Sequence, residues 1–365
     1  MFLYLITIIT VTGISLFSAD RRMNRNCEFF LAVMLCLALT IIAGTRLVGY
    51  DFPTYKIHFD AVPDITAYKR TDVSIELGYE LMVSLYKTFS TSFNGFLLVY
   101  AGATMLLAMA ACYKYSPYPL LSIGMFFAYS FFFQVMGQMR QPFAILFLYL
   151  FLIPLVEKRK YAASIMLILF ATIFLHKSCI LCLGILALRD RIMKPWQMGI
   201  LMLVTMAVYI LSALLLQIIL AVIPDSFYLY DTIVAYTSTK VIQVGFTLGM
   251  LERIGMFGVL YFMSYRYGIY QNNSRLRLWV NTYFTGICIY FAFISVAAEF
   301  ATRGTFFYIY SLFFAAPVLI KELPDKAKKI MYAIVLLWTV YTGAAIIKNQ
   351  KDAEEYFPYN STLFE

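Results

Sequence analysis

The sequence is poor in charged residues, in histidine and in sequence motifs for soluble enzymes. Only 13% of its 365 residues are Asp, Glu, Lys or Arg, which is about half the share found in soluble domains. Hydrophobic residues make up 62%, more than the interior of a water-soluble fold can bury. The chain has no Gly-rich phosphate loop, no H-E-x-x-H element and no internal repeat. These absences argue against a P-loop nucleotide hydrolase, a zincin metalloprotease and a solenoid, and leave an integral membrane protein.

Cysteine and net charge give no sign of redox, metal or nucleic-acid chemistry. All six cysteines lie in or at the ends of apolar runs, and Cys179-x-x-Cys182 has no second pair to complete a metal site. We therefore expect inert membrane thiols. The net charge of +9 is explained by membrane topology, so no nucleic-acid partner is expected.

The apolar residues form runs of helix length rather than the alternating strands of about ten residues found in outer-membrane barrels. The first run is followed by arginines rather than preceded by them, so we interpret it as a membrane span and not as a cleaved signal peptide. The sequence predicts an all-α bundle of about twelve spans: 1–17, 28–44, 93–112, 118–136, 140–156, 161–175, 177–188, 197–222, 246–266, 278–298, 303–320 and 328–346.

Basic residues gather at every second junction between these runs, which the positive-inside rule assigns to the cytoplasm. The whole chain, 1–365, then forms one membrane domain with both termini outside. Two outer segments are long, 45–92 and the Tyr-rich 224–245. In the first, Leu77, Leu81, Leu85 and Phe89 share one helical face, which predicts an interfacial amphipathic helix.

The run Tyr161–Leu188 contains His176 and Lys177 at its centre and has three basic residues on each side. If both flanks are cytoplasmic, the run crosses an even number of times, yet it is too short for two full spans. We predict a short re-entrant hairpin that turns at His176 in a buried or wet cavity. The alternative is one long tilted helix with His176 packed inside the bundle.

Ionisable residues at the outer helix ends suggest a binding site for an anion. A charge at membrane depth is costly and usually faces a functional cavity. Arginine's planar fork suits phosphate oxygens, and its charge is permanent. Five alternatives remain open: a snorkelling Arg140, an i,i+4 ion pair between Glu299 and Arg303, an ion pair between Glu252 and Arg253, turn chemistry at Asp51 and Tyr55, and a packing role for His176. The outer-end residues are Arg46, Asp51, Arg140, His176, Lys177, Glu252, Arg253, Glu299 and Arg303.

Five stretches follow one another in the order of a known family: "GTRLVGYDFPTYKIHF", "ELGYELMVSLYK", "MRQPFAILFLYLF", "KRKYAASIMLILFATIFLHKSCIL" and "ATRGTFFYIYSLFF". From about residue 44 to 315 the chain resembles the EpsG family, Wzy-like polymerases of bacterial O-antigen, capsule and exopolysaccharide. The most specific elements are R-Q-x-x-A and F-x-H-[KR]-S, and G-x-D-x-x-x-Y and a Gly-Tyr pair match more loosely. These elements fall on Arg140, Gln141, Ala144, Phe174, His176, Lys177, Ser178, Gly49, Asp51, Tyr55, Gly78 and Tyr79.

The resemblance implies a glycosyltransferase at the outer face of the bacterial cytoplasmic (inner) membrane, a multi-pass protein that joins oligosaccharide units held on undecaprenyl pyrophosphate. Arg140 and Arg303, helped by Arg46 or Arg253, would bind pyrophosphate, with Gln141, Tyr55 and Lys177 beside them. His176 is the first choice of general base, with Glu299 or Asp51 behind it. No metal or other cofactor is expected, because arginines can carry the charge stabilisation.

Three other functions stay open: a lipid-linked oligosaccharide flippase, an O-antigen ligase, and a membrane O-acyltransferase. A flippase needs charge on both sides of the membrane midplane. An acyltransferase needs a histidine that its cytoplasmic acyl donor can reach. Expected partners are lipid-linked oligosaccharides, membrane lipids, and chain-length regulator and flippase proteins.

Overall fold

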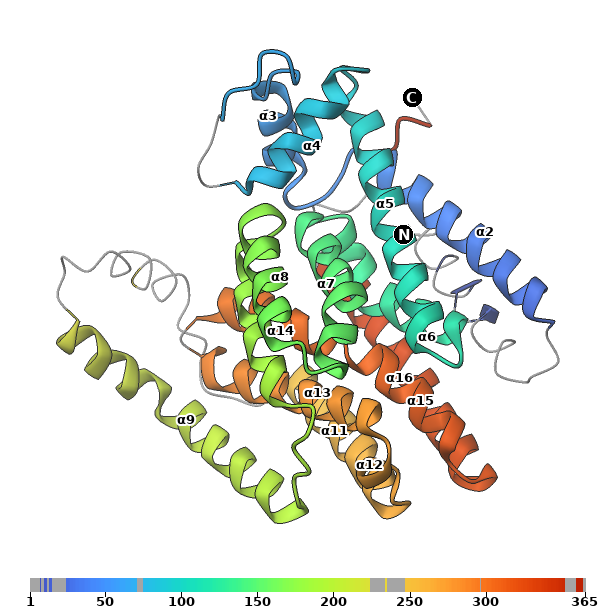
Figure 1. The fold of residues 1–365 in the computed structure, drawn as a ribbon, viewed down its shortest axis with the longest axis vertical. Helices are drawn as coiled ribbons and strands as arrows, with labels where there is room; N and C mark the ends of the chain where they lie inside the picture. The colour runs from blue at the N-terminus through green and yellow to red at the C-terminus, as the bar shows by residue number, and fades with distance from the viewer. Residues whose placement is uncertain are drawn as a thin grey trace. The chain divides into compact units, whose positions relative to one another are not determined.

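The structure, a computed structural model, describes residues 24–70, 75–223, 247–295, 297–351 and 359–363 and the isolated positions 7, 10, 11, 13, 14 and 234 (Figure 1). Within these residues it is helical, and the one strand-like pairing is a single antiparallel bridge between Arg46 and Ser361. The predicted all-α class is thus confirmed. The predicted span 1–17 and outer segment 224–245 lie almost wholly outside the described residues.

The helices follow the predicted apolar runs closely, and two of them are not α-helical. The element η1 is a π-helix and η2 a 3₁₀-helix. In chain order the elements are α2 Arg25–Gly44, α3 Phe52–Ala61, α4 Leu77–Lys87, α5 Phe93–Tyr115, α6 Pro119–Phe126, η1 Phe127–Val135, α7 Arg140–Glu157, α8 Tyr161–Phe174, η2 Lys177–Ala187, α9 Pro195–Val222, α11 Leu248–Arg266, α12 Ile269–Asn272, α13 Ser274–Phe293, α14 Ala298–Ile309, α15 Leu312–Glu322 and α16 Asp325–Lys351.

Five of the described helical segments are long and apolar enough to cross a membrane. They coincide with five of the predicted spans, and the total of twelve stays a prediction. Shorter apolar helices occupy Pro119–Val135, Tyr161–Phe174 and Lys177–Ala187. The five segments are Arg25–Gly44, Phe93–Tyr115, Arg140–Glu157, Pro195–Ser212 and Phe300–Glu322.

The chain divides into two compact units. Unit 1 comprises Met1–Ile180 and Ala316–Glu365, and unit 2 comprises Leu181–Ala315. In unit 1, helices α2 and α7 pack on α5, and α8 packs on α7. Figure 1 shows α3, α4 and the C-terminal segment at the same end of these helices.

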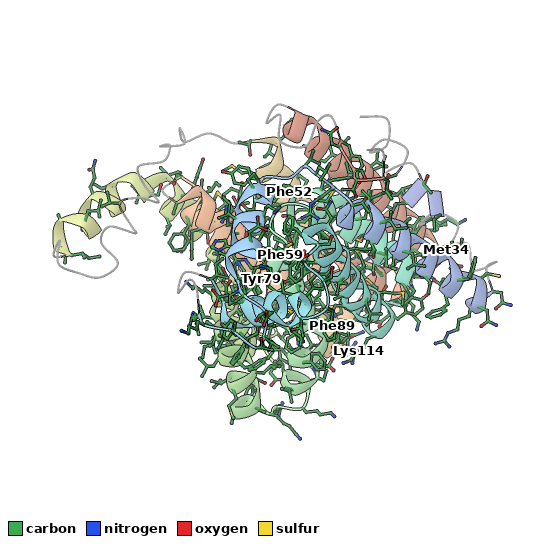
Figure 2. The ribbon with its side chains drawn as sticks, turned by 90° about the horizontal axis from the view of Figure 1, so that it is seen from above. Met34, Phe52, Phe59, Tyr79, Phe89 and Lys114 are labelled. Atoms are coloured by element: carbon green, nitrogen blue, oxygen red, sulfur yellow. The ribbon has the colours of Figure 1, made fainter. Side chains whose placement is uncertain are left out.

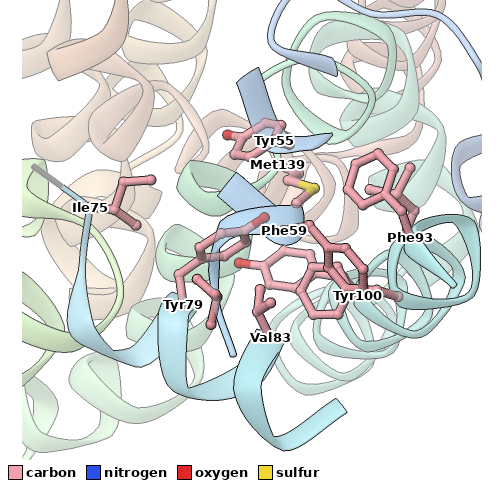
Figure 3. Close-up of a cluster of buried hydrophobic side chains, with 11 residues drawn as sticks. Tyr55, Phe59, Ile75, Tyr79, Val83, Phe93, Tyr100 and Met139 are labelled. Carbon is pink, nitrogen blue, oxygen red and sulfur yellow. The ribbon is translucent and has the colours of Figure 1, made fainter. Parts of the chain in front are cut away.

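The first outer segment folds onto unit 1 through an aromatic cluster. Side chains of α3 and α4 pack against the first turns of α5, with the Phe59 ring centroid 5.4 Å from Phe93 and 5.6 Å from Phe96. Figure 2, viewed from this end, shows Phe52, Phe59 and Tyr79 together, and Figure 3 shows the cluster in detail. Such ring pairs add to the free energy gained by burying the rings themselves. The cluster therefore holds α3 and α4 in place.

Helix α4 forms where an amphipathic helix was predicted. Its buried residues are Tyr79, Glu80, Val83 and Ser84. Leu85 and Phe89, on the predicted apolar face, are 54% and 82% exposed. The face of α4 that is buried in unit 1 is therefore not the predicted apolar face, and Phe89 lies just beyond the helix. That the exposed face rests on a membrane surface stays a prediction.

The run Tyr161–Leu188 is broken where the sequence predicted a turn. Helix α8 ends at Phe174, and the N–H groups of Leu175 and His176 both donate to the Ala171 carbonyl at 2.9 Å. The 3₁₀-helix η2 begins at Lys177. The break excludes one continuous helix, and the re-entrant path of the hairpin stays a prediction.

Unit 2 contains a buried polar network that holds the loop after η2. Asn281 of α13 is fully buried and donates to the carbonyls of Leu188 at 2.9 Å and Arg191 at 2.8 Å. The Tyr270 hydroxyl donates to the Asn281 side-chain oxygen at 2.7 Å. Tyr261 donates to the Met193 carbonyl at 2.7 Å. Buried polar groups need such partners, so this loop has a fixed path.

Candidate anion-binding site

Arg140 lies at the centre of the strongest candidate site, in unit 1. It is the first residue of α7, where the helix dipole favours a negative ligand. Its guanidinium carbon lies 5.6 Å from the ring centroids of both Tyr55 and Tyr79, within range of cation–π attraction. The side chain keeps 21% of its surface exposed. Arg140 therefore lies against the Tyr55–Tyr79 ring pair and does not extend freely into solvent, contrary to the snorkelling alternative.

Glu76 joins Arg140 to the helix break, and the sequence analysis missed it. One carboxylate oxygen pairs with Nη1 of Arg140, and the other accepts the backbone N–H of Lys177 at 3.0 Å. The carboxylate is 4% exposed. Its only signal in the sequence was its position two residues before the Gly78–Tyr79 pair. Glu76 thus connects the R-Q-x-x-A element with the F-x-H-K-S element.

Gly78 lets α4 reach the end of α8. A Cβ at this position would overlap the carbonyl oxygen of Phe174, two residues before His176. Helix α4 packs on α8 at this point. Only glycine permits such an approach of two backbones. The predicted Gly-Tyr element therefore places Glu76 and Tyr79 beside the helix break.

His176 is half-buried at the break, and its hydrogen bond indicates the tautomer of the neutral ring. Its Nδ1 accepts the backbone N–H of Ser178 at 3.2 Å, so the neutral ring carries its proton on Nε2. In this arrangement Nε2 can donate a hydrogen bond. To act as a general base, the ring must release Ser178 or move its proton. The Lys177 side chain next to it is exposed.

Arg46 is the second cation near Tyr79. Burial raises the pKa of the Tyr79 hydroxyl well above its usual range, and the charges of Arg140 and Arg46 oppose this rise. Arg46 is only 1% exposed and donates through Nη1 to the Ala43 carbonyl. Its Nε would lie 3.6 Å from a Cβ on Gly49, whose φ of +135° favours glycine. The charges of Arg140 and Arg46 therefore both act on the Tyr79 hydroxyl.

The C-terminal segment fixes the backbone that carries Arg46. The Leu47 N–H donates to the Asn360 carbonyl at 2.9 Å, and the Thr362 N–H donates to the Thr45 carbonyl at 3.0 Å. The Tyr359 hydroxyl donates to the Ile42 carbonyl at 2.8 Å. Residues 359–363 therefore lie against the end of α2.

Asp51, Tyr55 and Gln141 complete the set of predicted residues in unit 1. Burial raises the pKa of Tyr55, Arg140 lowers it, and the Asp51 carboxylate raises it further, so the two charges act on the Tyr55 hydroxyl. Asp51 precedes α3 and is half-buried. Gln141 follows Arg140 and is 1% exposed. Seven predicted site residues thus belong to one unit: Arg46, Asp51, Tyr55, Arg140, Gln141, His176 and Lys177.

The other three predicted residues belong to unit 2. The guanidinium carbon of Arg253 lies 4.1 Å from the Tyr290 ring centroid, and its Nη1 donates to the Gly249 carbonyl at 3.3 Å. Glu299 and Arg303 lie on α14, one turn apart. Arg303 is half-buried. Their role in binding stays a prediction.

The unit 1 site presents hydrogen-bond donors and a permanent positive charge, which is the chemistry that anion binding requires. Arg140 supplies both. His176 adds a group that can transfer a proton near neutral pH. Among the described residues, no three His, Cys, Asp or Glu side chains lie close enough to hold a metal ion.

Comparison with known proteins gives one match. None of the curated proteins and none of the solved structures compared with the chain is similar to it. The family model described as the EpsG family matches residues 29–361, nearly the whole chain and a longer stretch than the sequence motifs covered. The chain therefore belongs to the EpsG family, a family of Wzy-like polysaccharide polymerases.

Proposed function

We propose that this protein polymerises oligosaccharide repeat units carried on undecaprenyl pyrophosphate, at the outer face of the bacterial cytoplasmic membrane. A hydroxyl of the acceptor unit attacks C1 of the donor sugar. The C1–oxygen bond to pyrophosphate breaks, and the carrier leaves with both electrons of that bond. The hydroxyl proton passes to a base. The observation that carries the proposal is the arginine that begins α7, held beside the His176 break in a chain of this family.

Arg140 is the proposed ligand of the pyrophosphate. Charge develops on the leaving phosphate in the transition state, and preorganised donors stabilise it without reorganising during the reaction. Tyr55 and Tyr79 already fix the guanidinium, which supports preorganisation. Arg46, Gln141 and Lys177 are further proposed ligands. In the buried arrangement of Arg46, its charge acts at a distance on Tyr79.

His176 is the proposed base, and Asp51 is the alternative in unit 1. The Ser178 bond to Nδ1 has to break, or the Nε2 proton has to move, when His176 takes the acceptor proton. Asp51 acts on the Tyr55 hydroxyl and is half-buried. Arg253, Glu299 and Arg303 of unit 2 remain proposed participants from the sequence. Flippase and chain-length regulator proteins are proposed partners.

Surface polysaccharide from cells lacking this protein tests the proposal. The cells are complemented with wild type, Arg140→Ala, His176→Ala or the control Arg266→Ala, which removes an exposed arginine at the end of α11. We expect wild type and Arg266→Ala to restore the long-chain ladder on a gel. Arg140→Ala and His176→Ala should leave single repeat units at the surface, with each variant present in the membrane at wild-type amounts.

Two outcomes would contradict the proposal in different ways. If lipid-linked units accumulate on the cytoplasmic side of cells lacking the protein, it is a flippase. If His176→Ala makes polymer of normal length, His176 has no part in the reaction and Asp51→Asn becomes the next variant.

A further inference from the structure

Glu76 has two partners that come from separate parts of the chain. Its carboxylate pairs with Arg140, 64 residues away, and accepts the Lys177 N–H, 101 residues away. A buried carboxylate is retained only when both its charge and its lone pairs have partners. Here those partners are the first residue of α7 and the first residue of η2. One side chain therefore sets the distance between the two most specific sequence elements of this chain.

The contacts leave Arg140 few ways to move. The rings of Tyr55 and Tyr79 lie at equal distances from the guanidinium carbon, and Glu76 holds one of its terminal nitrogens. Among the described residues, no group accepts a hydrogen bond from the buried Nε of Arg140. The rings and Glu76 thus restrain the guanidinium group, and the 21% of the side chain that is exposed remains available to a ligand.

We propose that Glu76 is a positioning residue, which orients the Arg140 fork and the His176 break together for a polyprenyl pyrophosphate. The inference rests on the proposed function. The carboxylate contacts neither the phosphate nor the reacting sugar. It acts through its contacts with Arg140 and with the Lys177 N–H. Such positioning matters because a misplacement of about 1 Å in a catalytic group can cost about 100-fold in rate.

Glu80 provides a matched control one turn further along α4. It is also buried, at 1% exposure, and it accepts the Tyr68 hydroxyl at 3.0 Å. Glu80→Gln therefore removes a buried carboxylate from the same helix. If Glu76→Gln weakens ligand binding and Glu80→Gln does not, the loss comes from the contacts with Arg140 and Lys177 and not from a general destabilisation of α4.

The test measures how farnesyl pyrophosphate shifts the thermal unfolding of the purified protein in detergent. We expect this probe to stabilise wild type and Glu80→Gln. Glu76→Gln should bind it on the order of tenfold more weakly. Glu76→Gln should have no further effect in an Arg140→Ala background, because the carboxylate acts through that arginine.

A second pair of variants tests the hydrogen bond to η2. Lys177→Pro deletes the N–H that Glu76 accepts, at a first helical position where proline is tolerated. It should weaken binding more than Lys177→Ala, which keeps the N–H. If Glu76→Gln does not fold, the comparison of Lys177→Pro with Lys177→Ala tests the role of Glu76 in its place.

Three results would overturn the inference. Unchanged binding by Glu76→Gln would show that Arg140 is oriented without it, and tighter binding would show that the carboxylate competes with phosphate. In both cases the proposed polymerase stands. If wild type itself does not bind farnesyl pyrophosphate, the proposed pyrophosphate site fails, and the role of Glu76 fails with it.

Discussion

Two arginines, Arg277 in unit 2 and Arg140 in unit 1, show how the partners of a side chain separate a structural role from a proposed binding role. Arg277 in unit 2 is 8% exposed and donates to three backbone carbonyls, of Arg189 at 3.3 Å, Tyr270 at 3.2 Å and Gln271 at 2.8 Å. Arg140 in unit 1 contacts a carboxylate and two rings, and its side chain is 21% exposed.

The difference lies in what the donors of each arginine do. Backbone carbonyls cannot be exchanged for a ligand without disturbing the segment that carries them. Arg277 therefore stabilises α12, which carries two of its three carbonyls, and the chain between η2 and α9, which carries the third. Arg140 is oriented by groups that leave some of its donors and surface available. The same residue type therefore anchors backbone in unit 2 and presents charge in unit 1.

Replacing each arginine by lysine should give the largest effect and the clearest separation. Lysine keeps the charge and loses the planar fork and its stacking on rings. We expect Arg140→Lys to lower the polymerisation rate by about 100-fold, as for the loss of one transition-state donor. Arg277→Lys should keep the wild-type rate per folded molecule and lose about 1–3 kcal/mol of stability. Polymer formation by purified protein and thermal unfolding measure the two effects. Equal loss of rate in both variants would contradict the comparison.

Asn281 tests the unit 2 network by itself. Asn281→Ala removes the side chain that bonds the carbonyls of Leu188 and Arg191 and the Tyr270 hydroxyl, while that hydroxyl keeps its bonds to Met193 and Arg191. The loss of three hydrogen bonds of a buried side chain should cost about 1–3 kcal/mol, so a clear drop in the unfolding temperature is expected. Asn272→Ala, at the exposed end of α12, is the control and should change stability by less than about 0.5 kcal/mol. An unchanged unfolding temperature in Asn281→Ala would mean that the loop holds its path without the network.

Gly78→Ala tests the close approach of α4 and α8 in unit 1. The added methyl group collides with the Phe174 carbonyl and forces the helices apart, at a cost of about 1–3 kcal/mol. Since Glu76 and Tyr79 move with α4, polymer should shorten or disappear. Gly255→Ala in α11 is the control, because nothing lies within 4 Å of a Cβ there. A full-length ladder from Gly78→Ala would argue against the need for this contact.

Tyr359→Phe should give the smallest effect. It removes one hydrogen bond, to the Ile42 carbonyl, and leaves the backbone pairing of the C-terminal segment intact. We expect a loss of about 0.5–1.5 kcal/mol in thermal unfolding. Tyr267→Phe, whose parent side chain is 47% exposed, should have none. If Tyr359→Phe also abolished polymer, the segment would contribute more than support to Arg46.

Local pattern was enough to predict much of the fold and some of the site. Apolar run length predicted the helices, and the polar pair at 176–177 predicted the break between α8 and η2. Arg140 and His176 were expected near one another because they belong to the same family pattern. For α4, the sequence identified only the apolar residues Leu85 and Phe89, which are exposed. It did not predict that Tyr79 and Val83 are buried, because their burial results from packing against α5.

By itself, the sequence determined the membrane class, the positions of the helices and the family, because each depends on residue types within a run of the chain. Only the tertiary structure decided which residues surround Arg140. Glu76 meets it across 64 residues, and Ser361 pairs with Arg46 from the far end of the chain. The physical reason is that a buried charge needs partners in space, and a folded helical bundle supplies them from segments whose separation in sequence carries no local signal.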